Sequence, residues 1–157
     1  GQTPGTITYT EWPYAKNQNL SMVKIITPAD PKGVELDAKT AVMRMPDQQP
    51  YHNHIGGPHA GAMFTLGESA SGALVLGNFA DHLGQVVPLA VEANIKYRKV
   101  AMGPVIATAI MTRTVEEVLA ELESGTRPEF RVDITIATED GTVTGEMYVV
   151  WTLKRTK

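Results

Sequence analysis

The residues best suited to chemistry in this 157-residue chain gather between Tyr51 and Gly77, in the sequence YHNHIGGPHAGAMFTLGESASGALVLG. Histidines and an asparagine stand in a glycine-rich loop, and a long apolar segment follows in which Glu68 is the one charged residue. A carboxylate in apolar surroundings is costly unless it is paired, and its pKa rises. Because such carboxylates are enriched at reactive sites, Glu68 is the first candidate for a general base.

The apolar segment predicts one long helix from about residue 59 to about residue 78, with Pro58 at its entrance. The segment is apolar on most of its circumference, as a helix enclosed by a sheet must be. On such a helix we expect four small or hydroxyl-bearing residues to lie on the side that carries Glu68, namely Gly61, Thr65, Ser71 and Gly72.

Strand-like segments flank this helix. Residues 20–27 are apolar enough for a strand, and residues 34–45 alternate with Val34, Leu36, Ala38, Thr40 and Val42 on one side. After the helix, strands are predicted over 86–100, 104–113, 130–138 and 142–154, with Asp140-Gly141 as a hairpin turn. In the first of these, the alternation places Leu89, Val91, Ala93, Ile95 and Tyr97 on one side.

A short surface helix is predicted between two of these strands. Thr114 and Glu117 have the spacing of a capping box, and Gly125 ends the apolar helical pattern. The whole order predicts an α+β fold in which a curved antiparallel sheet of five to six strands wraps around the long helix. We expect a single domain over residues 1–157, with residues 1–19 as an N-terminal arm or short helix.

Composition excludes several classes of function. The net charge of -3 with scattered Lys and Arg argues against a nucleic-acid partner. The absence of cysteine excludes disulfides and thiolate metal sites, and the longest apolar stretch is too interrupted to predict a membrane span. We therefore expect a cytoplasmic protein with no membrane partner.

The loop and helix resemble the signature of hotdog-fold acyl-thioester enzymes, in particular the PaaI-like thioesterases. Asn53, Gly56, His59 and Glu68 stand at the spacing of that signature, and Leu66 and Ala70 flank the acid as in the family. The chain departs from the pattern at Ala60, where the family usually has Gly, and at Glu68, where Asp is commoner.

The resemblance implies hydrolysis of an acyl-CoA or acyl-carrier-protein thioester. Glu68 would act as general base on water or attack directly, with Asn53 and His59 as its catalytic partners. The N–H of Ala60 at the helix start would polarise the thioester carbonyl. The oxyanion and substrate-binding set would further include Gly57, Gly61, Thr65, Ser71 and Gly72. No cofactor is implied, since coenzyme A is part of the substrate.

Two other hotdog functions stay open. In acyl-carrier-protein dehydratases a loop His and a helix Glu act together on a 3-hydroxyacyl thioester, and His54 and Glu68 have that spacing. A hotdog domain can also bind acyl thioesters without turnover. A metal site at His52, His54 and His59 is not expected, because a cupin would require a glutamate shortly after His54 and flanking strands.

The resemblance also implies an assembly of identical chains. A curved sheet leaves edge strands, so we expect a homodimer or a dimer of dimers, that is, a homotetramer, with the active site between subunits. The acyl group and the choice between coenzyme A and acyl carrier protein are not specified by the sequence.

Overall fold

The computed structural model describes residues 24–25, 39–47 and 49–156. The arm or short helix predicted over residues 1–19 lies outside these ranges. So does most of the strand predicted over 20–27, of which Lys24–Ile25 forms β1.

Six antiparallel strands form one sheet in the order β1-β2-β4-β5-β6-β3. Their bounds are Lys24–Ile25 for β1, Thr40–Met45 for β2, Val86–Tyr97 for β3, Val105–Met111 for β4, Glu129–Thr138 for β5 and Val143–Arg155 for β6. The helices are α2 (Ala60–Asn78) and α3 (Val115–Glu123), with single 3-10 turns η2 at Gln49–Tyr51 and η3 at Ala80–His82. The predicted α+β class, strand number and long helix are confirmed.

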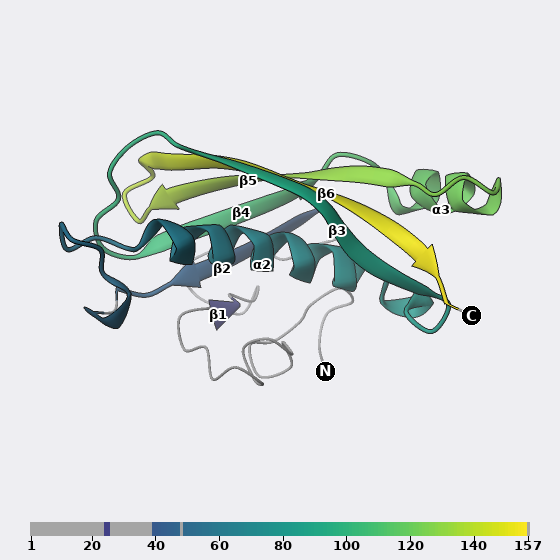
Figure 1. Ribbon diagram of the computed structural model, residues 1–157, viewed down its shortest axis with the longest axis horizontal. Coiled ribbons are helices and arrows are strands. Elements are labelled where there is room, and N and C mark those ends of the chain that lie inside the picture. The colour runs from purple at the N-terminus through teal and green to yellow at the C-terminus, as the bar shows by residue number, and fades with distance from the viewer. Residues whose placement is uncertain (1–23, 26–38, 48, 157) are drawn as a thin grey trace.

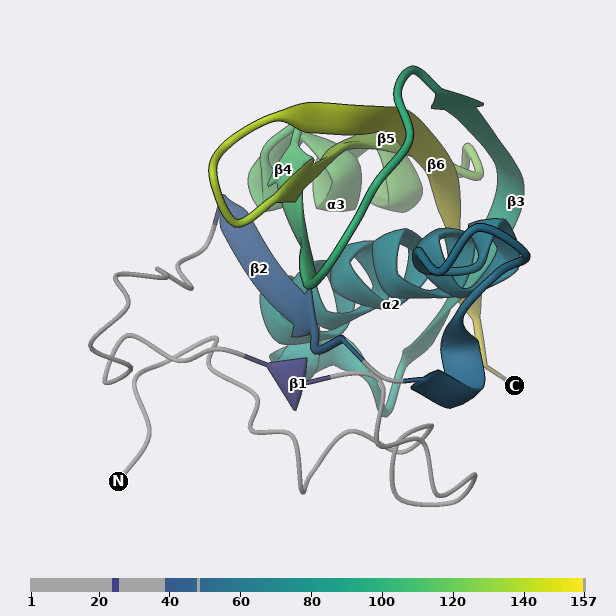
Figure 2. The same ribbon diagram turned by 90° about the vertical axis from the view of Figure 1, so that its left-hand side faces the viewer.

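The sheet curls around α2, so that β2, β4, β5, β6 and β3 surround the helix on successive sides (Figure 2). In side view α2 runs along the concave face of the sheet, and α3 lies at one end of the molecule, next to the end of β5 (Figure 1). Leu66, Ala70 and Leu74 of α2 are fully buried in the core. Gly67 lets the helix approach the sheet closely, because a Cβ at this position would lie 2.5 Å from Met147 Sδ.

Residues 34–38 of the strand predicted over 34–45 lie outside the described ranges, and in the described part the predicted alternation has the wrong phase. In β2 the residues that enter the main core are Ala41, Met43 and Met45, whereas Val42 packs with Ile106 on the outer face. The sequence did not distinguish the two faces of this strand, because apolar residues occupy both of them. Val42, on the outer face, is itself buried.

The alternation predicted for β3 is interrupted by a bulge. Directly opposed residues share a face, so Ala93, which pairs with buried Val149, faces the core, whereas Leu89, which pairs with Thr152, faces outward. The register shifts between Ala90 and Glu92, which leaves Val91 unpaired. The prediction that Leu89 and Ala93 share a side is therefore wrong, because the extra residue reverses the alternation.

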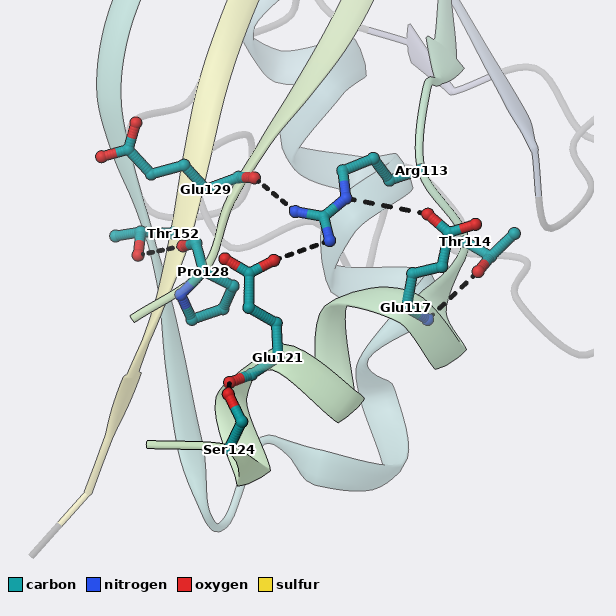
Figure 3. Close-up of polar contacts among 8 residues, drawn as sticks. All are labelled: Arg113, Thr114, Glu117, Glu121, Ser124, Pro128, Glu129 and Thr152. Atoms are coloured by element: carbon teal, nitrogen blue, oxygen red, sulfur yellow. Dashed lines mark hydrogen bonds and ion pairs between the residues drawn. The ribbon is translucent and has the colours of Figure 1, made fainter. Parts of the chain in front are cut away.

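The short helix α3 forms as the capping-box spacing predicts. Thr114 accepts a hydrogen bond from the Glu117 N–H at its hydroxyl oxygen, and Val118 and Leu122 are buried. Arg113 holds the helix against β5, since its guanidinium reaches the Glu121 carboxylate at 2.7 Å and the Glu129 carbonyl at 2.8 Å (Figure 3).

Thr114→Ala removes this cap and should lower the free energy of unfolding by about 1 kcal/mol, the usual effect of losing an N-cap hydroxyl. Thr126→Ala is the matched control, because Thr126 is exposed and no polar partner is recorded for its side chain in the described part of the chain. Urea unfolding followed by circular dichroism measures both, and equal midpoints for the two variants would contradict the capping role.

Candidate functional site

The loop before α2 is organised by the side chain of Asn53. Its amide oxygen accepts hydrogen bonds from the N–H groups of Ile55 and Gly57, both at 3.0 Å. The Asn53 N–H donates to the Gly57 carbonyl at 2.7 Å. Gly56 adopts φ 84°, a conformation that favours glycine. Asn53 therefore holds the loop, and its amide oxygen is already engaged by backbone donors.

Gly57 lies against the segment that follows β3. A Cβ at this position would clash with the Ala101 carbonyl oxygen and would lie 3.1 Å from Met102 Sδ. Because the Gly57 N–H donates to Asn53, it is not available to a substrate oxyanion in this arrangement. The contribution of Gly57 to the site is close packing of the two loops.

His59 is the N-cap of α2. Its Nδ1 accepts a hydrogen bond from the Gly61 N–H at 2.9 Å, and its carbonyl accepts from the Met63 N–H at 3.0 Å. Nδ1 must be unprotonated to accept this bond, so in the neutral ring the proton lies on Nε2. A Cβ on Gly61 would lie 3.2 Å from this nitrogen, so the glycine leaves room for the cap.

The first turn of α2 leaves backbone donors without acceptors. The N–H groups at a helix start have no intrahelical partner, and the cap satisfies the one on Gly61. Among the described residues, none accepts from the N–H of Ala60 or of Ala62. Ala60 is exposed, so its N–H is a donor of the kind that the sequence predicted for an oxyanion.

Because α2 is continuous, Gly61, Thr65, Ser71 and Gly72 stand at the predicted spacings from Glu68 that place residues on one side of a helix. Thr65 is half-buried, and its hydroxyl donates to the Gly61 carbonyl. Ser71 is fully buried, donates to the Glu68 backbone carbonyl at 2.7 Å, and accepts from Trp151 Nε1 at 3.2 Å. Gly72 is buried. Neither hydroxyl is hydrogen-bonded to the Glu68 carboxylate, because each is bound to a backbone carbonyl.

Glu68 is half-buried, and burial raises the pKa of its carboxyl above the ordinary value. None of the ion pairs recorded among the described residues includes it. Because no cation within the described chain offsets the desolvation, the carboxylate gains basicity. The rise in pKa that the sequence predicted is confirmed.

A groove of about 340 Å³ opens at the N-terminal end of α2. The Asn53 loop and Ala60 form one wall, and the segment from Tyr97 to Ala101 forms the other. The Tyr97 hydroxyl crosses between the walls and donates to the Ala60 carbonyl at 2.8 Å. Arg98 is paired with Glu146, whereas the side chain of Lys99 has no ion-pair partner in the described part of the chain.

The histidines of the loop do not converge on one point. His52 is hydrogen-bonded to Asp47 at 2.6 Å, His54 is exposed, and His59 caps the helix. Within the described ranges, no group of three His, Asp or Glu side chains is arranged to hold a metal ion. No helix in the same ranges is long and apolar enough to cross a membrane.

The sequence matches the family described as a domain of unknown function, DUF4442, over residues 21–153. The chain belongs to this family. Comparison with curated proteins found no match for this DUF4442 chain.

Solved structures resemble the DUF4442 chain over most of its length. A Pseudomonas aeruginosa protein of unknown function, described as a probable thioesterase, is 26% identical over 94% of this chain and 92% of its own, with a TM-score of 0.77. A thioesterase family protein from Silicibacter pomeroyi is 17% identical, covering 92% and 94%, with a TM-score of 0.68. A mutant thioesterase from Pseudomonas aeruginosa is 18% identical, covering 92% and 91%, with a TM-score of 0.66.

The fold of this DUF4442 chain is therefore the hotdog fold of thioesterases, as the sequence predicted. The assignment to the PaaI-like branch stays a prediction.

Tyr97, Lys99 and Ala101 of the groove were not among the predicted site residues. The bond from Tyr97 to Ala60 and the packing of Ala101 against Gly57 join segments about 40 residues apart, and no local pattern reports such contacts. The one available signal was the basic run at residues 96–99, KYRK, at the end of a strand.

Gly57→Ala should lower the free energy of unfolding by about 1–3 kcal/mol, because the new methyl group forces the two loops apart. Gly84→Ala is its control, since a Cβ there meets nothing within 4 Å. That change should be neutral or stabilising by up to about 1 kcal/mol. Thermal and urea unfolding measure both variants, and wild-type stability in Gly57→Ala would refute the close packing.

Proposed function

We propose that this protein hydrolyses acyl thioesters of phosphopantetheine carriers, either coenzyme A or acyl carrier protein. The observation that carries the proposal is Glu68, a half-buried carboxylate with a raised pKa and with no ion pair among the described residues. A carboxylate of this kind is suited to remove a proton from water at neutral pH. The resemblance to solved thioesterases supports the same reaction class.

The free N–H of Ala60 supplies the second requirement of thioester hydrolysis. As water attacks the carbonyl carbon, negative charge develops on the carbonyl oxygen, and a backbone donor at a helix N-terminus stabilises it. Ala60 lies in the wall of the groove, so a thioester there can reach this donor. The tetrahedral intermediate then expels the thiolate, which takes up the proton removed from water.

One chain cannot present both groups to one carbonyl. Ala60 and Glu68 are eight residues apart, which is about 12 Å along a helix axis. The N–H of a first-turn residue points away from the helix body, so an oxyanion bound there lies still farther from Glu68. A second copy, with its α2 antiparallel beside the first, brings the Glu68 of one chain to the Ala60 of the other. We therefore place the reaction between two chains.

The long edge strand β3 suits such pairing. β3 bonds to β6 on one side, and no other strand of the described chain pairs with its second side. Its exposed apolar residues include Val91, which is 52% exposed. An open edge that carries apolar side chains favours the addition of another strand. The homodimer or dimer of dimers expected from the sequence forms, in this proposal, through β3.

The carrier lies along the groove at Lys99. Phosphopantetheine is anionic in coenzyme A and in acyl carrier protein, and Lys99 with the N-terminal end of α2 makes this region electropositive. An assay of thiol release from a panel of acyl-CoAs and acyl carrier proteins tests both the activity and the carrier. No thiol release from any member, together with saturable binding, would replace hydrolysis by a binding role.

Glu68→Gln should lower the rate of hydrolysis by at least about 100-fold, because it keeps the volume of the side chain but removes the base. His54→Ala should leave hydrolysis nearly unchanged, since His54 is exposed outside the groove wall. Formation of an enoyl product that both variants abolish would instead identify a dehydratase. Full hydrolysis by Glu68→Gln would remove the carboxylate from the mechanism.

Glu68 also predicts a pH-dependent stability difference. Because its folded pKa is raised, its contribution to stability is complete below the ordinary pKa of glutamic acid and is lost as the pH rises through the folded value. The melting temperature of Glu68→Gln should therefore exceed that of the wild type by more at about pH 8 than at about pH 4. Calorimetry at the two pH values measures both melting temperatures. A larger gain in melting temperature at about pH 4 than at about pH 8 would show that the carboxylate has an unrecognised cationic partner.

Val91→Lys should produce a folded monomer without activity, because a charge on the edge strand opposes pairing of two copies. Ile110→Lys is the control, since Ile110 is 46% exposed but lies in β4, between β2 and β5. Sedimentation at micromolar concentration should give a dimer or tetramer for the wild type and for this control. A wild-type protein that sediments as a monomer would overturn the paired site.

A further inference from the structure

The first complete peptide unit of α2, which joins Ala60 and Gly61, is held by a side chain at each end. Its carbonyl oxygen, on Ala60, accepts from the Tyr97 hydroxyl at 2.8 Å. Its N–H, on Gly61, donates to His59 Nδ1 at 2.9 Å. In a trans peptide these two groups point in opposite directions, so the two side chains grip the unit from opposite ends.

The two side chains come from different parts of the fold. His59 is the helix cap, whereas Tyr97 is the last residue of the edge strand β3. Tyr97 is 47% exposed and lines the groove, so its hydroxyl is not required to fill the core. Burial raises the pKa of its phenol further above neutral pH, where the hydroxyl is protonated and can donate a hydrogen bond.

The peptide unit before this one is also fixed, but only at its oxygen. The His59 carbonyl accepts from the Met63 N–H, whereas no described residue accepts from the N–H of Ala60. The N–H of Ala60, a residue that lines the groove, therefore lies between two fixed groups, and its direction is set before any ligand arrives. Donors fixed in this way stabilise a developing oxyanion without reorganisation.

We infer that Tyr97 is a positioning residue, which together with His59 clamps the Ala60–Gly61 peptide and thereby aims the Ala60 N–H at the reacting carbonyl. This inference rests on the proposed hydrolysis and assigns His59 a positioning role in place of direct catalysis. It also gives the edge strand a part in the chemistry, because β3 carries one of the two groups that hold the donor.

Tyr97→Phe tests the clamp, because it removes the hydroxyl and keeps the ring. The kcat for thioester hydrolysis should fall about tenfold, with KM within about twofold, since a misaimed donor weakens the transition state more than the substrate complex. Tyr148→Phe is the matched control, because the Tyr148 ring lies beneath Arg131, 4.2 Å from its guanidinium carbon, on the outer face. Wild-type kcat in Tyr97→Phe would overturn the inference.

The His59 variants separate positioning from direct chemistry. His59→Ala removes the acceptor and should lower kcat, whereas His59→Asn keeps a capping acceptor and should recover most of the loss. In the double variant Tyr97→Phe/His59→Ala the loss should be smaller than the product of the single losses, because both act on one peptide unit. An equal loss in His59→Asn and His59→Ala would assign chemistry to the imidazole and overturn the clamp.

Amide hydrogen exchange tests the clamp without any substrate. In Tyr97→Phe the Gly61 amide should exchange at least several times faster than in the wild type, and in Tyr148→Phe it should exchange at the wild-type rate. Unchanged exchange in Tyr97→Phe would overturn the clamp whatever the activity. If the wild type releases no thiol from any carrier, the proposed function fails, and this measurement alone decides the clamp.

Discussion

The uneven enclosure of α2 governs the rest of the structure. β2, β4 and β5 cover one side of the helix with buried apolar residues, whereas much of β3 on the opposite side stays exposed. Glu68 of this helix is half-buried. Full enclosure would leave no path to water, and full exposure would leave the carboxyl with an ordinary pKa.

Close approach of backbone segments makes this arrangement possible. Gly67 brings α2 against Met147 of the sheet, and Gly57 brings the loop before α2 against Ala101. The side chain of Asn53 then closes that loop through two backbone donors. The loop that leads into α2 is consequently fixed, and no described residue accepts from the N–H of Ala60 at the helix start.

Local signals in the sequence were sufficient for the elements and for Glu68. Each of these signals involves only a few neighbouring residues, so the sequence pattern alone identifies it. They are the isolated acid in an apolar segment, the capping box at Thr114 and the hairpin turn at Gly141. The bulge at Val91 was missed because an extra residue leaves the apolar alternation looking continuous. The engagement of Asn53 and the bond from Tyr97 to Ala60 were missed because they depend on how the loop closes and on contacts 37 residues apart.

The order of strands in the sheet also determines when this protein can fold during synthesis. β3 pairs with β6, and the paired residues are separated by between 48 positions, from Tyr97 to Gly145, and 69 positions, from Val86 to Arg155. The ribosome therefore releases α2 and β3 well before the strand that joins β3 to the sheet. Until residues 143–155 emerge, β3 has no partner strand among the described residues, and its unpaired edges are open to association with other chains.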